Sequence, residues 1–181
     1  MKKLNLGCGN DIREGYVNLD KAKLEGVDIV HNLEQLPLPF KDNEFDEIYA
    51  KDIIEHLDYI PLLKELHRIL KPNAKLIIMS PHYTSTNYWS DPTHKHAFAV
   101  RTFSFFAKDA PNLRTTQREY YFDFAFSKIQ NIKITFPKHF SIFSTITSVL
   151  VNLTPMTQML YELTVWHSLF PAENVQVELI K

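Results

Sequence analysis

The stretch Lys3-Leu4-Asn5-Leu6-Gly7-Cys8-Gly9-Asn10 decides the fold of this chain. It is a short, mostly apolar run that leads directly into a Gly-x-Gly turn, a pattern typical of a strand followed by a tight turn. Glycine permits backbone conformations that are closed to other residues, and it lets a ligand come close to the main chain. In an open sheet of alternating strands and helices, a turn of this kind after the first strand is the usual place for a nucleotide-type ligand.

An acidic residue follows where such a ligand needs it. Asp20 ends a second strand-like run that starts at Tyr16. A carboxylate at the end of the second strand can accept hydrogen bonds from the hydroxyls of a ribose. Ile12 stands where a dinucleotide-binding fingerprint has its third glycine. The turn therefore suits a ligand with a ribose and no phosphates better than a nicotinamide dinucleotide.

The composition is that of one globular domain over residues 1–181. The chain is 45% hydrophobic and 23% charged, and its net charge of -1 gives no electrostatic footprint for nucleic acid. A single cysteine, Cys8, excludes a disulfide framework, and the apolar run near Met1 is too short for a signal peptide. A cytoplasmic setting is therefore expected.

Strand and helix patterns alternate along the first half of the chain. Strands are predicted at residues 27–30, 45–50 and 75–79, and apolar residues at helical spacing predict a helix over residues 60–70. This alternation predicts an α/β fold with an open, mostly parallel twisted sheet and helices on both faces. Residues 7–16 are fewer than the dozen or so that a parallel crossover usually needs. The first crossover helix must be shortened or absent, and a later segment should cover the ligand.

Residues 4–80 resemble a class I S-adenosylmethionine-dependent methyltransferase of the small type-11 kind. The residues that carry the resemblance are Leu6-Gly7-Cys8-Gly9, Asp20, Leu38-Pro39-Phe40, Asn43-Glu44-Phe45-Asp46, Glu55-His56-Leu57 and Leu70-Lys71-Pro72. They resemble, in order, the family's first motif, its ribose-binding acid, its "LPF…D-x-x-FD" segment, its "EHL" segment and its "LKPGG" segment. Several such motifs in the right order are far more specific than the glycines alone.

The resemblance implies a Rossmann-like fold whose last strand is antiparallel, with strand candidates at 129–136 and 174–180 completing the sheet. It implies S-adenosylmethionine as the cofactor. The residues that it places against the cofactor are Gly7, Cys8, Gly9, Asn10, Asp20, Asn32 and Leu33. The implied function is in-line methyl transfer to a small-molecule acceptor, either sugar-containing or lipid-linked. The alternative is a non-catalytic module that binds the cofactor for assembly or regulation.

The segment that follows the fifth strand carries the candidates for the acceptor side. His82, His94 and His96 lie in this segment together with Asp91, at the strand end where open α/β sheets bind ligands. We predict His94 or His96 as the general base, Asp91 as its orienting partner and His82 as a further candidate. The alternatives are histidines that brace the loop and a metal site formed by Asp91, His94 and His96. Because their spacing matches no dedicated metal motif, no metal is predicted.

Two helical stripes occupy residues 140–170. Thr154 followed by Pro155 is typical of a helix cap and a first-turn proline, so a second helix should start there. No charged residue occurs from Phe140 to Tyr161, but polar residues and Pro155 interrupt the run, so no membrane span is predicted. We expect a helical insertion packed over the sheet near the substrate side. A lid over an apolar substrate and a homodimer face are the alternatives.

Overall fold

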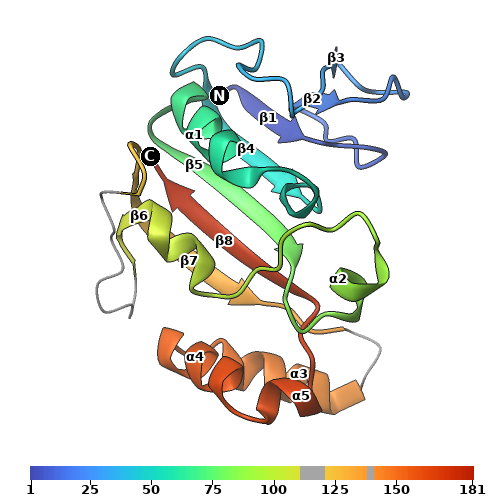
Figure 1. The fold of residues 1–181 in the computed structure, drawn as a ribbon, viewed down its shortest axis with the longest axis vertical. Helices are drawn as coiled ribbons and strands as arrows, with labels where there is room; N and C mark the ends of the chain where they lie inside the picture. The colour runs from blue at the N-terminus through green and yellow to red at the C-terminus, as the bar shows by residue number, and fades with distance from the viewer. Residues whose placement is uncertain (111–120, 138–140) are drawn as a thin grey trace.

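The structure is a computed structural model of the chain, and it describes residues 1–110, 121–137 and 141–181. Its centre is an eight-stranded sheet with the order β3-β2-β1-β4-β5-β8-β7-β6 (Figure 1). The strands are β1 (Lys3–Leu6), β2 (Val17–Asp20), β3 (Ile29–Val30), β4 (Phe45–Lys51), β5 (Leu70–Pro81), β6 (Ala107–Asp109), β7 (Phe126–Ile134) and β8 (Asn174–Ile180). Strands β1 to β5 are parallel, and β8 is antiparallel to its neighbours β5 and β7. The predicted mostly parallel sheet with an antiparallel last strand is confirmed.

The crossover from β1 to β2 consists of turns and bends without a helix, as its length predicts. Hydrogen bonds from buried asparagines hold this segment in place, where other crossovers have a packed helix. The side-chain amide of Asn5 donates to the Asp11 carbonyl oxygen at 2.7 Å and to Oδ1 of Asn18 at 2.9 Å. Oδ1 of Asn18 also accepts from the backbone N–H of Arg13 at 2.9 Å. These bonds hold the irregular crossover against the sheet, because they satisfy its backbone groups.

The two faces of the sheet differ in polarity. One face carries buried aliphatic side chains from every central strand, such as Leu4, Ile48, Leu76 and Leu179. The opposite face carries the residues that alternate with these along each strand, and most of them are polar and paired with one another. The Glu47 carboxylate lies on this face, 3.6 Å from Nζ of Lys3 and 3.0 Å from Nζ of Lys75, and it accepts a hydrogen bond from the Tyr16 hydroxyl. Beside it, Cζ of Arg13 lies 3.5 Å from the centroid of the Tyr49 ring.

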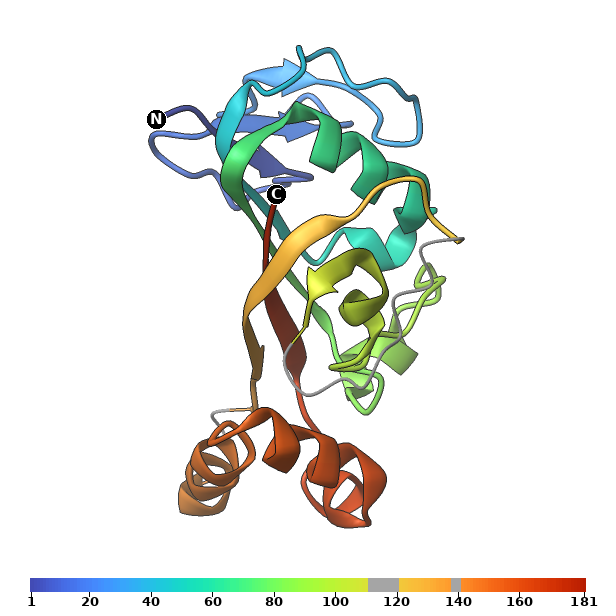
Figure 2. The same ribbon diagram turned by 90° about the vertical axis from the view of Figure 1, so that its left-hand side faces the viewer.

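Helices cover the apolar face. They are α1 (Tyr59–Ile69) and the short η1 (Ile54–His56) and η2 (Thr102–Phe106), while Figure 2 shows no helix of the described residues over the polar face. The prediction had placed helices on both faces. The difference follows from the polarity, since paired charges gain nothing from being covered by an apolar helix. Helix α1 buries Leu62, Leu63, Leu66 and Ile69 against the sheet and ends where β5 begins.

The helical insertion comprises α3 (Ser141–Val151), α4 (Pro155–Leu163) and α5 (Trp166–Leu169). Thr154 caps α4, as predicted, and forms a reciprocal capping box with Thr157. The three helices lie beyond the end of β7 and β8, not over a face of the sheet (Figures 1 and 2). A second apolar cluster anchors them, formed by Val100, Ile134, Phe136, Val151, Tyr161 and Ala172. No helix in the described part of the chain is long and apolar enough to cross a membrane.

Candidate active site

A cavity of about 470 Å³ opens at the carboxyl ends of the parallel strands. Gly7 from the end of β1 and Asp20 from the end of β2 line it, together with Asn32 and Leu33, which follow β3. Its volume is within the range of about 300–1,000 Å³ that small-molecule sites occupy. Four of the residues predicted to contact the cofactor therefore lie around one cavity.

The turn after β1 has a left-handed backbone conformation that favours glycine. Gly7 has a φ of 62°, and a Cβ at this position would lie 2.5 Å from the Ile53 side chain. The turn also fixes the carboxylate of Asp20, whose Oδ2 accepts from the Gly9 amide and Oδ1 from the Ala22 amide, each at 2.8 Å. Each carboxylate oxygen can accept a further bond, so both remain available to a ligand's hydroxyls.

The other predicted cofactor residues lie beside this cavity. Cys8 and Asn10 line a smaller cavity of about 260 Å³, which Gly7 shares with the main one. Burial raises the pKa of the Cys8 thiol, with a further contribution from the charge of Asp20, so it is a poor nucleophile. Gly9 contributes its amide to Asp20.

A later segment of the chain forms the wall that the missing first helix leaves open, as expected. Thr93 and Lys95 line the main cavity, and Nζ of Lys95 lies 3.2 Å from Oε1 of Glu34 on another part of its lining. The backbone amides of Lys95 and His96 both donate to the carbonyl oxygen of Glu55, at 2.8 and 3.2 Å. Residues 91–97 are thereby held next to η1.

A second cavity of about 590 Å³ adjoins the first, because Asp52 and His56 line both. Its remaining walls are mostly polar. They comprise Lys51, Glu55, Met79, Pro81, Asn87, Asp91, His94, Glu173 and Asn174. A polar acceptor could therefore lie beside a ligand in the main cavity.

Glu55 lines the second cavity, and half of the hydrogen-bonding capacity of its carboxylate is unused. Its side chain is fully buried, and Oε2 accepts from the Ser80 hydroxyl at 2.9 Å. Oε1 is buried and has no hydrogen-bond partner among the described residues, and the nearest imidazole nitrogen, Nε2 of His94, is 3.9 Å away. Burial raises the pKa of the Glu55 carboxyl to about 7.

His94 presents its Nε2 toward this carboxylate. Its Nδ1 lies 2.9 Å from the carbonyl oxygen of Tyr88, which can only accept, so Nδ1 carries the proton of the neutral ring. The lone pair then resides on Nε2, which is also 3.8 Å from Oδ2 of Asp91. The ring stacks on that of Tyr88 with the centroids 5.5 Å apart.

His56 is fixed in the same way by a different partner. Its Nδ1 lies 2.9 Å from Oγ1 of Thr93, and that hydroxyl donates to Oδ1 of Asp91 at 2.6 Å. Because the hydroxyl proton is used, Nδ1 of His56 must be the donor. Burial, and then the neighbouring His94, lowers the pKa of His56 and favours its neutral form. The two imidazole centroids are 4.6 Å apart.

The structure separates the four predicted catalytic residues. His94 and Asp91 line the second cavity, but His94 is oriented by the hydrogen bond that it donates to the Tyr88 carbonyl oxygen. Asp91 orients His56 through Thr93 instead. His96 packs against the ring of Tyr59, with the centroids 5.0 Å apart, and lines neither cavity.

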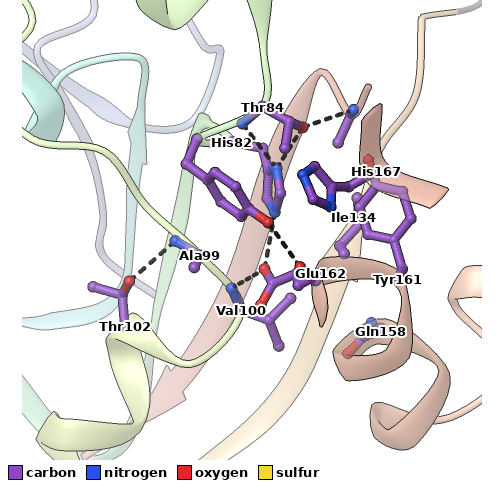
Figure 3. Close-up of polar contacts among 12 residues, drawn as sticks. His82, Thr84, Ala99, Val100, Thr102, Ile134, Gln158, Tyr161, Glu162 and His167 are labelled. Carbon is purple, nitrogen blue, oxygen red and sulfur yellow. Dashed lines mark hydrogen bonds and ion pairs between the residues drawn. The ribbon is translucent and has the colours of Figure 1, made fainter. Parts of the chain in front are cut away.

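His82 lines neither cavity. It is fully buried, with Nε2 2.9 Å from Oε1 of Glu162 and Nδ1 2.8 Å from Oγ1 of Thr84 (Figure 3). It connects the end of β5 to α4. The sequence reasoning missed Glu55 and His56 as site residues, although both belong to the quoted Glu-His-Leu segment.

Residues 4–78 match a family model described as a methyltransferase domain. The match covers less than half of the chain. An uncharacterised protein of Methanocaldococcus jannaschii is 43% identical over 89 residues, covering 42% of this chain and 39% of that protein. Demethylmenaquinone methyltransferase of Staphylococcus epidermidis is 35% identical over 75 residues, covering 39% of this chain and 31% of that enzyme. The chain thus matches only 39% and 31% of the length of these relatives.

Solved methyltransferase structures share the fold over nearly the whole chain. A SAM dependent methyltransferase from Archaeoglobus fulgidus aligns over 99% of this chain and 86% of its own, with a TM-score of 0.59 and 18% identity. An S-adenosylmethionine dependent methyltransferase from Mesorhizobium loti aligns over 99% and 90%, with a TM-score of 0.54 and 14% identity. At these identities the likeness shows the fold alone. The predicted resemblance and the predicted open, mostly parallel sheet with an antiparallel last strand are confirmed.

Proposed function

We propose that the protein is an S-adenosylmethionine-dependent methyltransferase that acts on a polar small molecule. The observation that carries the proposal is the junction of two cavities. One has the glycine turn and the fixed carboxylate of a ribose site, and the other contains an imidazole with a free lone pair. The match of residues 4–78 to a methyltransferase domain model supports the same chemistry.

The residues of the main cavity fit this cofactor. Both oxygens of Asp20 have acceptor capacity left for the ribose hydroxyls, and Gly7 leaves the main chain open to a ligand. Asn32 offers an amide to the polar edge of adenine, and Leu33 offers an apolar contact to its ring. No helix begins behind the glycine turn, so nothing there provides the helix N-terminus that a pyrophosphate uses.

S-adenosylmethionine, when bound, supplies a methyl group on a positively charged sulfur. The chain's main task is then to align the acceptor with that group, and alignment can lower a barrier by about 7–11 kcal/mol. Of the four predicted catalytic residues, His94 is the one whose free lone pair lies in the acceptor cavity. We propose that Nε2 of His94 activates the acceptor's hydroxyl or amine, with Tyr88 fixing the ring.

The lining of the second cavity favours a polar acceptor. Asp52, Glu55, Asp91 and Glu173 are acidic, so a sugar-containing molecule or one with an amine fits better than an apolar ring. The quinone-type acceptor implied by the name of the staphylococcal relative is accordingly the less suitable class for this chain.

The competing function is a non-catalytic, cofactor-binding module with a role in assembly. The observation that favours it is the apolar surface of the helical insertion, where Phe143, Leu163, Val165 and Leu169 are exposed. Large exposed apolar patches are typical of interaction sites, and a second copy of the chain is one candidate to cover this one. This function predicts tight cofactor binding with no methyl transfer to any acceptor.

Calorimetry with S-adenosylmethionine and its demethylated product tests the proposal. The wild-type chain should bind both, and Asp20→Ala should weaken binding by about 1.5–3 kcal/mol, the scale of a hydrogen bond to a charged group. Glu25→Ala is the matched control, since Glu25 is an exposed acid that does not line the cavity. Tight binding of NAD without binding of either sulfur compound would overturn the proposal.

A further inference from the structure

We propose that Glu55, His56 and His94 form a binding site for one divalent transition-metal ion, with Zn²⁺ as the best match. Each of the three offers one ligand atom, and these atoms all lie within 4.8 Å of one another. Two histidines and one carboxylate with an open position are a ligand set that zinc uses in catalytic sites. Because ligand atoms lie about 2.0–2.2 Å from a zinc ion, the three side chains must move closer together to share one.

The two histidines already make the hydrogen bonds that metal-ligating histidines usually make with their second ring nitrogen. In metal sites, a ligating histidine usually donates its other ring N–H to a carbonyl or a carboxylate-linked group. Nδ1 of His94 donates to the Tyr88 carbonyl oxygen, and Nδ1 of His56 donates to Thr93, which Asp91 holds in turn. Both Nε2 atoms are thereby left free to coordinate.

The unused hydrogen-bonding capacity of Glu55 is a second, independent observation that supports a metal site. Its Oε2 is held by Ser80, while Oε1 is buried without a partner and lies 3.9 Å from Nε2 of His94. An unsatisfied buried acceptor destabilises the folded protein, and more so when it is charged. A cation between Oε1 and the two imidazoles would remove that destabilisation. The sequence had offered Asp91, His94 and His96 as an alternative metal set, but His96 packs on Tyr59 outside the cluster.

The position of the site gives the ion a role that rests on the proposed function. His56 lines both cavities and His94 lines the acceptor cavity, so the fourth position of the ion would be open to the acceptor. A metal ion that binds a hydroxyl favours its ionised form. His94 would then activate the acceptor as a ligand of the ion, and the acceptor's proton would leave to water in the polar cavity. The binding of the ion itself does not depend on methyl transfer.

The test is calorimetry of Zn²⁺ binding to protein stripped of metal, with the absorption spectrum of Co²⁺ as a second readout. The wild type should bind one equivalent with a tetrahedral Co²⁺ spectrum. Thr93→Val, which removes the hydroxyl that holds His56, should weaken binding by about 10–100-fold. His94→Ala and Glu55→Gln should weaken it further, because each removes a ligand. His96→Ala is the matched control and should bind as the wild type does.

The outcomes separate this inference from the proposed function. Equal Zn²⁺ affinity in the wild type, His94→Ala and His96→Ala would mean adventitious binding and would overturn the metal site. Absence of Zn²⁺ binding in wild-type protein that still binds S-adenosylmethionine would also overturn it, while the proposed function would stand. Cofactor binding by Glu55→Gln serves as the check that this variant is folded, since Glu55 does not line the cofactor cavity.

Discussion

Two glutamates of this protein lie beside histidines in its interior, and they differ in how far their hydrogen bonds are satisfied. Oε1 of Glu162 accepts from Nε2 of His82 at 2.9 Å and from the Val100 amide at 2.8 Å (Figure 3). Oε1 of Glu55 accepts from no described residue, and Nε2 of His94 stays 3.9 Å away. Residue type and burial are nearly the same in both pairs. The unused capacity of Glu55, next to a cavity, is the reason why we propose a functional role for the Glu55–His94 pair.

The largest expected effect is on turnover. Activation of an acceptor by a positioned group contributes about 10²–10⁴-fold, so His94→Ala should reduce turnover by that order. Cofactor affinity should change little, because His94 does not line the main cavity. The measurement is turnover on an acceptor found by screening polar metabolites. Full turnover in His94→Ala would show that the Glu55–His94 pair has no role in catalysis.

Mutation of the His82–Glu162 pair should instead lower the stability of the fold. His82→Ala leaves the Glu162 carboxylate without its imidazole in a nearly buried site, and breaking a buried pair costs about 3–5 kcal/mol. We expect a loss of this size in the free energy of unfolding, measured by urea denaturation, with cofactor affinity unchanged. His96→Ala is the control, since His96 has no carboxylate partner in the described structure. Wild-type stability in His82→Ala combined with lost turnover would reverse the assignment of the two pairs.

Glu47 on the polar face is a third carboxylate. Its hydrogen-bonding and charged partners lower its pKa more than burial raises it. Burial raises its pKa, but hydrogen bonds from Tyr16 and Lys75 and the charges of Lys75 and Lys3 hold the pKa below its ordinary value. A folded-state pKa below the unfolded one stabilises the protein above the unfolded pKa, and this contribution is lost as pH falls. We expect Glu47→Gln to be less stable than the wild type by about 1 kcal/mol at neutral pH.

The pH dependence is the informative part of that experiment. The stability gap between the wild type and Glu47→Gln should narrow as pH falls from 6 toward and below about 4, where the unfolded carboxyl protonates. Urea denaturation at several pH values measures it. A gap that stays constant over this range would show that the Glu47 charge contributes nothing.

Much of the sheet could be predicted from the sequence because its signals are local. Apolar runs mark β1, β4 and β5, and the length of residues 7–16 alone excludes a full crossover helix. The polar face of the sheet was missed, although Glu47, Tyr49 and Lys51 alternate with buried residues along β4. That alternation is the signal of a strand with one solvated face.

The site could be predicted only in part, because its decisive contacts join distant residues. The turn at Gly7 and the acid at Asp20 are local features, so the cavity that we propose for the cofactor could be located from the sequence. His82 was expected to face the acceptor, but its orientation depends on Glu162, which is 80 residues away. The role of Glu55 depends likewise on a loop that follows the next strand. An apolar stripe at 141–163 predicts an amphipathic helix, but it does not say what its apolar face packs against.

The most direct test of the account is a crystal structure of the protein with S-adenosylhomocysteine, the product of methyl transfer. We predict the ribose hydroxyls at Asp20 and the sulfur at the opening between the two cavities, on the side of His56 and His94. A sulfur that faces the polar side of the sheet or the His82–Glu162 pair, or a ligand bound outside the cavity, would contradict the account.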